Sequence, residues 1–446
     1  RTFMAGDQFI WSHRHISWDQ IADWRAYTDT HIQRAVAGRL PDTDPPNWQH
    51  TYFTNPFYLN ELLPNTNDKD RLLGNIAFNL TLTDNLKLML RSGTDFWTDT
   101  RINIINFERV RNGNKTPGRY SEEVLRSQET NHDFLLTYDK MVGKDFSIVA
   151  QVGGAQRTNF YKRNFVSVGE LVVDGVYNLG NSNPSQNSVA SSIFQSEVQS
   201  LYASTQFGFK NALFLDVTAR NDWSSTLPSV DRSYFYPSVS GSAVLTDLLN
   251  ISSSILSFGK VRASWAQVGN DADPYQLAQT FRSAGSWNGS VPQYFENLTL
   301  ANATLKPEIT TGVEVGVDLR FFKNKLTLDA TYYDQTTENQ ILGVEISKAS
   351  GYDKRILNAG KINNRGVEVS LSGTAIEQNG FKWEVGLNYA KNRNLVVELA
   401  EGLNTYTLQE RRGLISIAQV GQPYGSLFGV GFKRTEDGQI IYANGL

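Results

Sequence analysis

The chain has 446 residues, of which 40% are hydrophobic and 12% aromatic, and it contains no cysteine. The lack of cysteine excludes disulfides, thiol catalysis and cysteine-ligated zinc sites. Lysine and arginine number 42 and aspartate and glutamate 45, so the formal net charge is −3 and no strongly basic stripe is present to follow a nucleic-acid backbone.

The low mean hydropathy of −0.37 does not exclude a membrane protein. The sequence has no run of about 18 apolar residues, which a transmembrane helix would need. A transmembrane β-strand, however, alternates lipid-facing apolar residues with lumen-facing polar ones, so its average resembles that of a soluble protein. The high aromatic content fits the aromatic girdles of such a barrel, and it also fits a large soluble β-protein.

Residues 1–48 differ from the rest of the chain. Apolar residues recur at helical spacing within Trp18–Val36, which predicts a short helix in a region that is either part of a barrel or a loop. His13 and His15 alternate and could project to one side of a strand. Only five histidines occur and no third ligand is near, so we expect no metal site there.

From about residue 70 onward, apolar and polar residues alternate with a period of two. In 309–321, for example, Ile309, Val313 and Val317 fall on one side of the chain and Glu314 and Asp318 on the other. A helix would instead repeat its apolar residues every three to four positions, so the pattern predicts β-strands. The same pattern predicts strands at 76–82, 146–154, 201–209, 213–219, 261–265, 367–371 and 381–389.

Short and long connections between these strands take turns. The tight turns are Thr83–Asn85, Val142–Lys144, Lys210–Asn211, Lys323–Asn324, Gln378–Gly380 and Glu436–Gly438. The long connections are 100–120, 164–192, 270–306 and 397–422, with 224–232 as a medium loop and 247–257 as the longest inner turn. Such sorting is typical of outer-membrane barrels, which have short periplasmic turns and long extracellular loops, and it is unusual for a Greek-key sandwich.

We therefore expect an all-β fold, an antiparallel transmembrane β-barrel in which residues 49–446 supply the strands and the long extracellular loops. The strand count is about 13–15, and a bacterial barrel usually closes on an even number. We find no plug-like segment, so closure is expected to need residues outside this chain.

The long connection 270–306 holds the first candidate binding residues. They are five aromatic residues, Tyr275, Phe281, Trp287, Tyr294 and Phe295, beside the amides Asn288 and Gln293. Flat aromatic rings beside amides can stack on sugar rings or hold peptides. The alternative is that they pack loop against loop or contact a protein that covers the loops.

Arg220 and Asp222 form a second candidate pair. By strand parity they point inward, opposite to Val217 and Ala219, where they could line a substrate path or pair with a plug. The acidic stretches Asn65–Asp70 and Asn270–Asp273 could hold Ca²⁺ through oxygen ligands, but turn chemistry explains them equally well, and we expect no cofactor. No carboxylate pair, Walker A, GxSxG or HExxH pattern indicates an enzyme.

Several long segments resemble one known family, the SusC/RagA outer-membrane transporters of Bacteroidetes. The segments are TNPFYLNELLPNTNDKDRLLGN (54–75), ARNDWSSTLPSVDRSYFYPSVSG (219–241), GKVRASWAQVGNDADPYQL (259–277), LKPEITTGVEVGVDLRFF (305–322) and SKASGYDKRILNAGKINNRGVEVSL (347–371). The last two of these also resemble the late-barrel pattern of TonB-dependent receptors in general. Nothing in the chain resembles the plug domain of that family.

The resemblance implies a function as well as a fold. It implies part of a plugged barrel of about 22 strands in the outer membrane. Such a barrel imports glycan or peptide oligomers under a SusD-like lipoprotein lid, with energy from TonB acting through the plug, and two transporter–lipoprotein pairs could form a dimer. Its partners would be that lipoprotein, TonB, the substrate and outer-membrane lipid. The alternative is a secreted all-β carbohydrate-binding protein or glycan-active enzyme, which would need a soluble core.

Overall fold

The computed structural model describes residues 57, 60, 64–105, 110–111, 114–115, 117–411 and 413–440. The helix expected within Trp18–Val36 and the pair His13 and His15 lie outside these residues. Within the described residues the protein is nearly all β, as the period-two pattern predicts, and no helix there is both long and apolar enough to cross a membrane.

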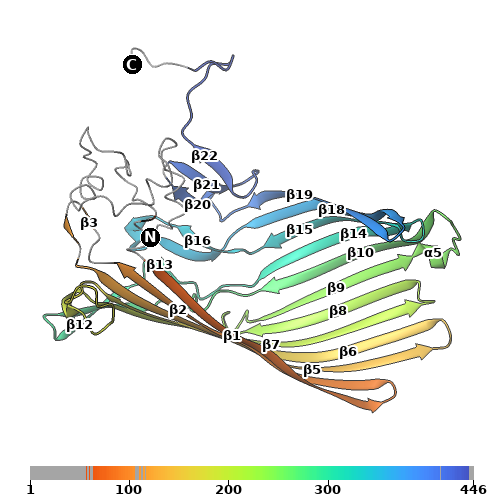
Figure 1. Ribbon diagram of the computed structural model, residues 1–446, viewed down its shortest axis with the longest axis horizontal. Helices are drawn as coiled ribbons and strands as arrows, with labels where there is room; N and C mark the ends of the chain where they lie inside the picture. Colours follow the sequence, from red (N-terminus) through yellow and green to blue (C-terminus); the bar gives the residue numbers. More distant parts are fainter. Residues whose placement is uncertain are drawn as a thin grey trace. The chain divides into compact units, whose positions relative to one another are not determined.

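One large sheet dominates the fold (Figure 1). Its twelve strands are hydrogen-bonded in chain order: β1 (Asn65–Thr83), β2 (Leu86–Ile105), β5 (Arg119–Val142), β6 (Phe146–Val168), β7 (Ser188–Phe209), β8 (Leu213–Ser224), β9 (Ser233–Val244), β10 (Leu256–Asn270), β14 (Glu308–Phe321), β15 (Leu326–Glu338), β18 (Lys361–Gln378) and β19 (Phe381–Glu398). Residues 65–70, expected as an acidic loop, are thus the start of β1.

The remaining strands are short and belong to the connections of the main sheet. They are β3 (Val110–Arg111) with β4 (Asn114–Lys115), β11 (Phe281–Trp287) with β12 (Val291–Glu296), β13 (Thr299–Leu300) with β17 (Lys354–Asn358) and β16 (Ile341–Glu345), and β20 (Thr405–Arg411), β21 (Leu414–Gln419) and β22 (Ser426–Gly429). Three single-turn helices, η2 (Pro184–Gln186), α5 (Leu245–Leu248) and η3 (Lys348–Ser350), complete the described elements.

The chain divides into two compact units. The first comprises Arg1–Asn75, Gly93–Thr130 and Asn159–Gln195, and the second Ile76–Ser92, Asn131–Thr158 and Ser196–Leu446. The first unit contains two short ion pairs. Arg71 Nη2 lies 2.6 Å from Asp95 Oδ2, and Arg163 Nε lies 2.5 Å from Glu123 Oε1. Its apolar cluster of Tyr120, Val168 and Leu171 lies where β5 begins and β6 ends.

In the second unit the two faces of the sheet have opposite character. The register sets Val315 of β14 directly beside Ala263 of β10 and Tyr332 of β15, and Tyr332 beside Val367 of β18. These residues share one side, because paired residues of antiparallel strands point the same way. We call it the apolar face. Its large side chains stay exposed, 48% for Val313 and 45% for Val315, so the described residues of the chain do not cover them.

The opposite side, which we call the polar face, carries charged, hydroxyl and amide side chains. Arg262 of β10, Asp329 of β15 and Arg220 of β8 lie on it. A soluble sheet would bury its apolar side and expose its polar one. Here the apolar side has no covering layer among the described residues of the second unit, which is the arrangement expected where a sheet meets lipid.

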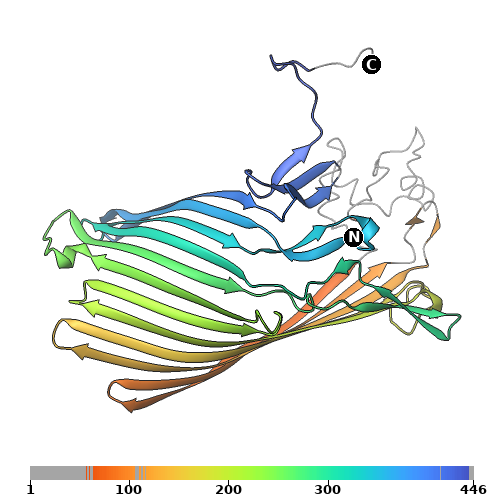
Figure 2. The ribbon, with the colours of Figure 1, turned by 180° about the vertical axis from the view of Figure 1, so that it is seen from behind.

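Within the second unit, the tight connections between neighbouring strands of the main sheet meet at one end of the strands, which we call the turn end (Figures 1 and 2). Lys210, Asn211, Asn379 and Gly380 have φ values of 52°, 52°, 52° and 82°, the left-handed conformation that tight hairpins require. Neighbouring turns are joined by backbone bonds, such as the Lys210 N–H to the Asp145 carbonyl at 2.6 Å. The turns predicted at 83–85, 142–144, 210–211, 323–324 and 378–380 are therefore confirmed, whereas Glu436–Gly438 lies within the isolated bridge between Arg434 and Ile440 and joins no strands of the main sheet.

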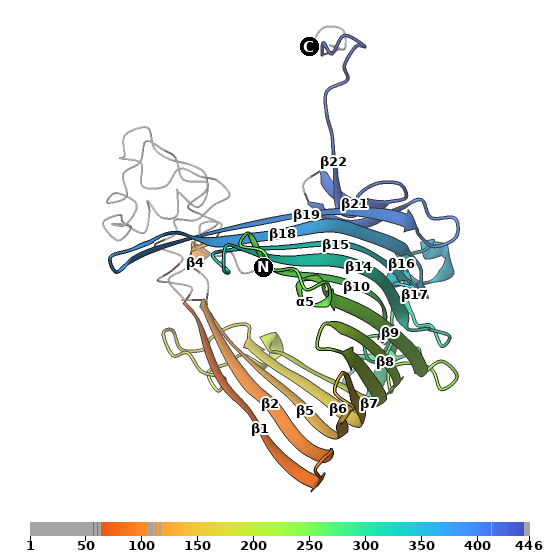
Figure 3. The same ribbon diagram turned by 90° about the vertical axis from the view of Figure 1, so that its right-hand side faces the viewer.

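The long connections of the second unit emerge at the opposite end, which we call the loop end. They join Asn270 to Glu308, Glu338 to Lys361 and Glu398 to the strands β20, β21 and β22, which lie beside the end of β19 (Figure 3). The Val396 N–H donates to the Gln422 carbonyl at 3.0 Å, which fixes that position. The sequence did not predict the strands β16 and β17 within 339–360, since their five-residue length leaves too short a pattern.

Candidate functional site

The aromatic residues of the connection after β10 are carried by a β-hairpin. Phe281 begins β11 and Trp287 ends it, Tyr294 and Phe295 lie in β12, and Tyr275 precedes the hairpin with a positive φ of 67°. The turn at Asn288 and Gly289 is left-handed at both positions, with φ of 52° and 75°. Trp287 therefore stands at the tip of the hairpin, next to this turn.

These aromatic side chains are exposed rather than packed. Trp287 is 65% exposed, Tyr294 68%, Phe281 67%, Tyr275 58% and Phe295 47%. Packing of loop against loop would bury most of this surface, so it does not account for these residues within the described part of the chain. Large exposed aromatic surface on an otherwise ordered hairpin is typical of a surface that contacts a partner or ligand.

The hairpin presents its aromatic residues on two sides. Phe281 pairs with Glu296, which shares a side with Tyr294, whereas Trp287 pairs with Val291, which shares the other side with Phe295. A register shift between Ser283 and Gly285 separates the two halves of β11 and moves Trp287 to the side opposite Phe281. Four of the five residues named from the sequence therefore form two pairs on opposite sides of the hairpin, and the fifth, Tyr275, lies before it, so the five do not form a single platform.

A second loop supports the hairpin. Tyr352 follows η3, and its hydroxyl donates a hydrogen bond to Glu296 Oε1 at 2.8 Å. This bond to a carboxylate raises the pKa of the Tyr352 phenol. Nearby, β13 pairs in parallel with β17, and the Asp353 N–H donates to the Leu298 carbonyl at 2.9 Å. The connections 271–307 and 339–360 are thus one joined structure.

The base of this structure is anchored to the main sheet. Leu305 is fully buried and packs with Leu227, Tyr234 and Ala272. Beside this cluster, the buried Ser224 hydroxyl bonds the carboxylate of Asp271. These contacts fix both ends of the connection 271–307 to β8 and β9, so the hairpin is held on a rigid support.

Arg220 and Asp222 both lie on the polar face, as their parity predicts. Arg220 Nε donates to Asp222 Oδ1 at 2.8 Å, and Arg220 Nη2 donates to Ser200 Oγ at 2.8 Å. The Tyr236 hydroxyl donates to the other carboxylate oxygen, Asp222 Oδ2, at 2.6 Å. The Asp222 side chain is 7% exposed and that of Arg220 39%, so part of the guanidinium is open to a partner on this face. Contact with a plug stays a prediction.

Elsewhere on the polar face, long side chains lie flat across neighbouring strands. Arg262 spans β14 and binds both carboxylate oxygens of Asp329 at 2.9 Å each, as well as Thr331 Oγ1 at 2.6 Å. It can do so because Gly316 lies beneath it: a Cβ there would come within 2.7 Å of Arg262 Nε. Gly366 similarly leaves room for the ring of Tyr333, which reaches Asn392.

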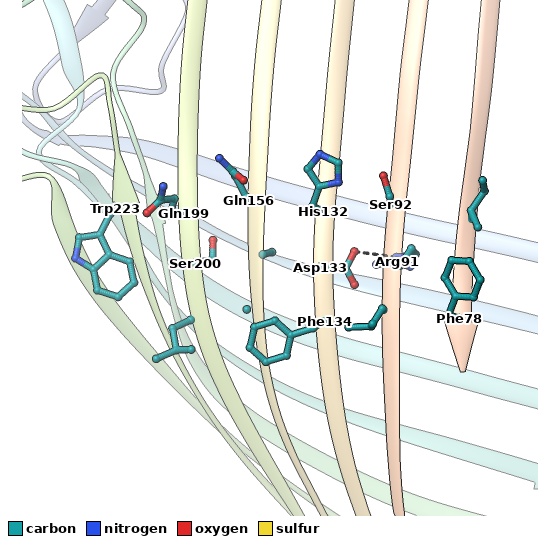
Figure 4. Close-up of a pocket in the computed structure, with 15 residues that line it drawn as sticks. Phe78, Arg91, Ser92, His132, Asp133, Phe134, Gln156, Gln199, Ser200 and Trp223 are labelled. Carbon is teal, nitrogen blue, oxygen red and sulfur yellow. Dashed lines mark hydrogen bonds and ion pairs between the residues drawn. The ribbon is translucent and has the colours of Figure 1, made fainter. Parts of the chain in front are cut away.

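A depression of about 790 Å³ in the second unit opens on the apolar face (Figure 4). Leu201 and Trp223 line it, and both share the side of Val217 by register. The ion pair of Arg91 and Asp133, 2.9 Å apart, lies among the same strands. Apolar side chains line its part nearer the turn end, and a row of polar ones lines the rest: Ser92, His132, Gln156 and Gln199. This row marks the level at which the apolar face becomes polar.

The sequence did not predict several residues that support the hairpin or the Arg220–Asp222 pair. Glu296 and Tyr352 are 56 positions apart, and no local pattern signals their contact. Tyr236 and Ser200 could have been assigned to the polar face by parity, because each alternates in step with Arg220 once the strand register is known. Among the described residues no group of three or more histidine, aspartate or glutamate side chains could hold a metal ion.

The chain matches a protein-family model described as "TonB dependent receptor-like, beta-barrel" over residues 7–427. It is 25% identical over 299 residues to TonB-dependent receptor P26 of Formosa agariphila, covering 63% of this chain and 29% of that protein. It is 21% identical over 383 residues to TonB-dependent receptor SusC of Bacteroides thetaiotaomicron, covering 80% of this chain and 36% of that protein. The chain thus spans about a third of the length of these relatives.

Solved structures show the same fold. The RagAB peptide transporter matches with a TM-score of 0.74 and 22% identity, over 87% of this chain and 43% of that one. The RagAB peptide importer in its "closed-closed" state matches with a TM-score of 0.75 and 20% identity, over 92% of this chain and 47% of that one. The main sheet therefore has the fold of part of a TonB-dependent barrel, and the antiparallel barrel predicted from sequence is confirmed.

The cluster around Asp222 predicts a stability effect. Asp222→Ala removes the acceptor of both Arg220 and Tyr236, and we expect the free energy of unfolding to fall by about 2–4 kcal/mol, since a hydrogen bond to a charged group contributes roughly 1.5–3 kcal/mol. Guanidinium unfolding of the complete protein in detergent, followed by tryptophan fluorescence, measures this change.

The matched control is Asp353→Ala, which removes an exposed ion pair with Lys348 at 3.6 Å. Exposed pairs contribute about 0–1 kcal/mol, so this variant should unfold nearly like the wild type. Equal effects of the two substitutions would contradict the view that the Asp222 cluster stabilises the sheet.

Proposed function

Because the chain belongs to the family of TonB-dependent receptor-like β-barrels, we propose that it forms part of the wall of an importer that takes up nutrient oligomers. Proteins of this family are outer-membrane transporters and are not enzymes, and we assign this chain to the same location and class. The alternative of a secreted carbohydrate-binding protein or glycan-active enzyme is therefore rejected. In this proposal the apolar face meets lipid and the polar face lines the interior of the barrel.

The observation that carries the proposal is the sheet with one exposed apolar face and one polar face, whose tight turns gather at one end and whose structured loops gather at the other. We place the turn end in the periplasm and the loop end outside the cell, as length sorting in outer-membrane barrels suggests. The wall then supplies rigidity and a polar interior, and the loops supply binding.

The partners and the substrate class follow from resemblance. The protein would act with a SusD-like surface lipoprotein over the loop end and with TonB through a plug. Similarity to SusC and to the RagAB peptide importer supports this assignment. The RagAB peptide importer supports peptide oligomers as the substrate class, and glycan oligomers are the alternative that the sequence resemblance implies. Dimerisation of transporter–lipoprotein pairs stays part of the same proposal.

Within the loops, we assign capture of substrate or of the lipoprotein to the β11–β12 hairpin. The hairpin is exposed, ordered and rich in aromatic residues, and rigid aromatic side chains bind partners at a low cost in conformational entropy. Trp287 is the principal candidate because it is at the tip and 65% exposed. Tryptophan is enriched among residues whose truncation weakens binding by about 2 kcal/mol or more.

The test is uptake by whole cells. A strain that lacks the gene should fail to take up either labelled oligopeptides or labelled oligosaccharides, and the complete wild-type gene should restore that uptake. Dissipation of the proton-motive force should abolish it, because TonB draws on that energy. Uptake of both oligomer classes at wild-type rates in the deletion strain would contradict the proposal.

The same assay tests the hairpin. Trp287→Ala should reduce uptake or retention of the lipoprotein about tenfold or more, which is roughly 1.4 kcal/mol or more of binding free energy. The control is Trp383→Ala, which removes an exposed tryptophan from the apolar face of β19 and should lower the yield of folded barrel without lowering uptake per folded molecule. Heat-modifiable gel mobility measures folding. Normal uptake and normal lipoprotein retention in Trp287→Ala cells would assign the hairpin no role in capture.

A further inference from the structure

Two cations interrupt the apolar face of β19 toward the loop end, and Leu395 beyond them is again apolar and exposed. Phe381, Trp383, Val385, Leu387 and Tyr389 alternate on this face and are 46–63% exposed. They cover nine residues, about 30 Å at roughly 3.3 Å per residue, which is the length of a transmembrane strand segment. The next two positions of the same face carry cations, Lys391 and Arg393.

A third cation lies beside these two. The register sets Arg365 of β18 directly opposite Arg393, and Lys391 opposite Val367. The apolar face continues from Val367 to Tyr332 of β15, so all three cations lie on that face, level with or just beyond the tyrosines. Arg365, Lys391 and Arg393 are all exposed.

This arrangement has no structural benefit within the chain. Like charges directly opposite each other destabilise a strand pair. Among the described residues, no carboxylate forms an ion pair with any of the three cations. The nearest acidic residue along the ladder is Asp334, opposite Arg365, and its Oδ1 accepts from Asn363 Nδ2 at 2.6 Å. One carboxylate against three cations leaves the cluster positive.

We propose that Arg365, Lys391 and Arg393 bind the phosphate-bearing headgroup of a lipid in the leaflet at the loop end. The cluster lies where such a headgroup lies, directly beyond the apolar band, and its charge complements phosphate. Guanidinium groups bind phosphate through paired N–H donors, and their stems can lie along apolar surface while the charged ends reach the headgroup. Tyr389 and Tyr332 lie at the level of the sugar or upper acyl chain.

This inference rests on the orientation proposed above, which makes the leaflet the outer one. The outer leaflet of an outer membrane consists of phosphorylated glycolipid, so the ligand is a lipid A type headgroup. The polar row of Ser92, His132, Gln156 and Gln199 ends the apolar face of other strands of this unit but carries no positive cluster. The inferred site is therefore local to β18 and β19.

The experiment uses the complete protein, purified in detergent and mixed with diphosphoryl lipid A. Native mass spectrometry measures the lipid retained. The wild type should retain lipid A, and the triple variant Arg365→Gln, Lys391→Gln, Arg393→Gln should retain about tenfold less, since each cation near an anionic headgroup adds to binding. Dephosphorylated lipid A should not be retained, and inorganic phosphate should not displace lipid A.

The matched control removes three cations from the turn end, Lys144→Gln, Lys323→Gln and Lys325→Gln, and should retain lipid A like the wild type. If the triple variant folds poorly by heat-modifiable mobility, the single variant Lys391→Gln keeps the test, with a smaller loss. Equal retention by wild type and variant, retention of dephosphorylated lipid A, or displacement by inorganic phosphate would each overturn the inference.

The orientation of the barrel is tested separately, so that a wrong orientation can be distinguished from a wrong headgroup site. A cysteine at Ser286 in the hairpin should react with an impermeant thiol reagent on intact cells, and a cysteine at Asn324 in the turn should not. Reversed labelling would overturn the proposed orientation, and the outer-leaflet assignment with it. Correct labelling with no lipid A retention would overturn the headgroup site alone.

Discussion

The structure depends on one constraint, that a sheet exposed to hydrocarbon must bond every backbone N–H and C=O to a neighbouring strand. Unpaired backbone groups cost several kcal/mol each in lipid, and strands satisfy them only through continuous ladders. In the second unit the β10–β14 ladder runs without interruption from Asn270↔Glu308 to Val261↔Val317. The β15–β18 ladder, which includes Leu328↔Leu371, has no interruption either. Side-chain alternation then follows from the pleat, which gives each strand one apolar and one polar side.

The polar face meets a different requirement. Its charged residues lie in a sheet that offers no core, so they pair with each other: Arg262 with Asp329 across Gly316, and Arg220 with Asp222, Ser200 and Tyr236. These side chains satisfy their hydrogen bonds within the sheet, and Arg262 does so by lying over Gly316. On the apolar face, by contrast, the three cations Arg365, Lys391 and Arg393 form no ion pair with any described residue. Because charged groups in this sheet otherwise pair with each other, these three indicate a ligand outside the chain.

The sequence predicted those strand segments in which one side faces lipid, because there apolar and polar residues must alternate. The alternation of 309–321 matches β14 (Glu308–Phe321) within one residue. The match is close because almost the whole strand carries the apolar face and ends directly at the turn. It did not predict that β6 continues to Val168, or that β7 begins at Ser188, because beyond the band both sides of a strand can be polar and the period disappears. The aromatic loop was found from composition, but its division into two sides depends on the register shift after Ser283, which no local pattern reveals. The Tyr352–Glu296 bond was likewise beyond reach, since it joins two separate connections.

The central claim is that the exposed apolar side of the main sheet faces lipid. Spin labels placed one at a time at positions 313 to 319 of β14 in the reconstituted complete protein test it most directly. We expect strong relaxation by oxygen, which concentrates in lipid, at Val313, Val315, Val317 and Leu319, and weak relaxation at Glu314, Gly316 and Asp318. Relaxation by oxygen at 314 as strong as at 315 would contradict it.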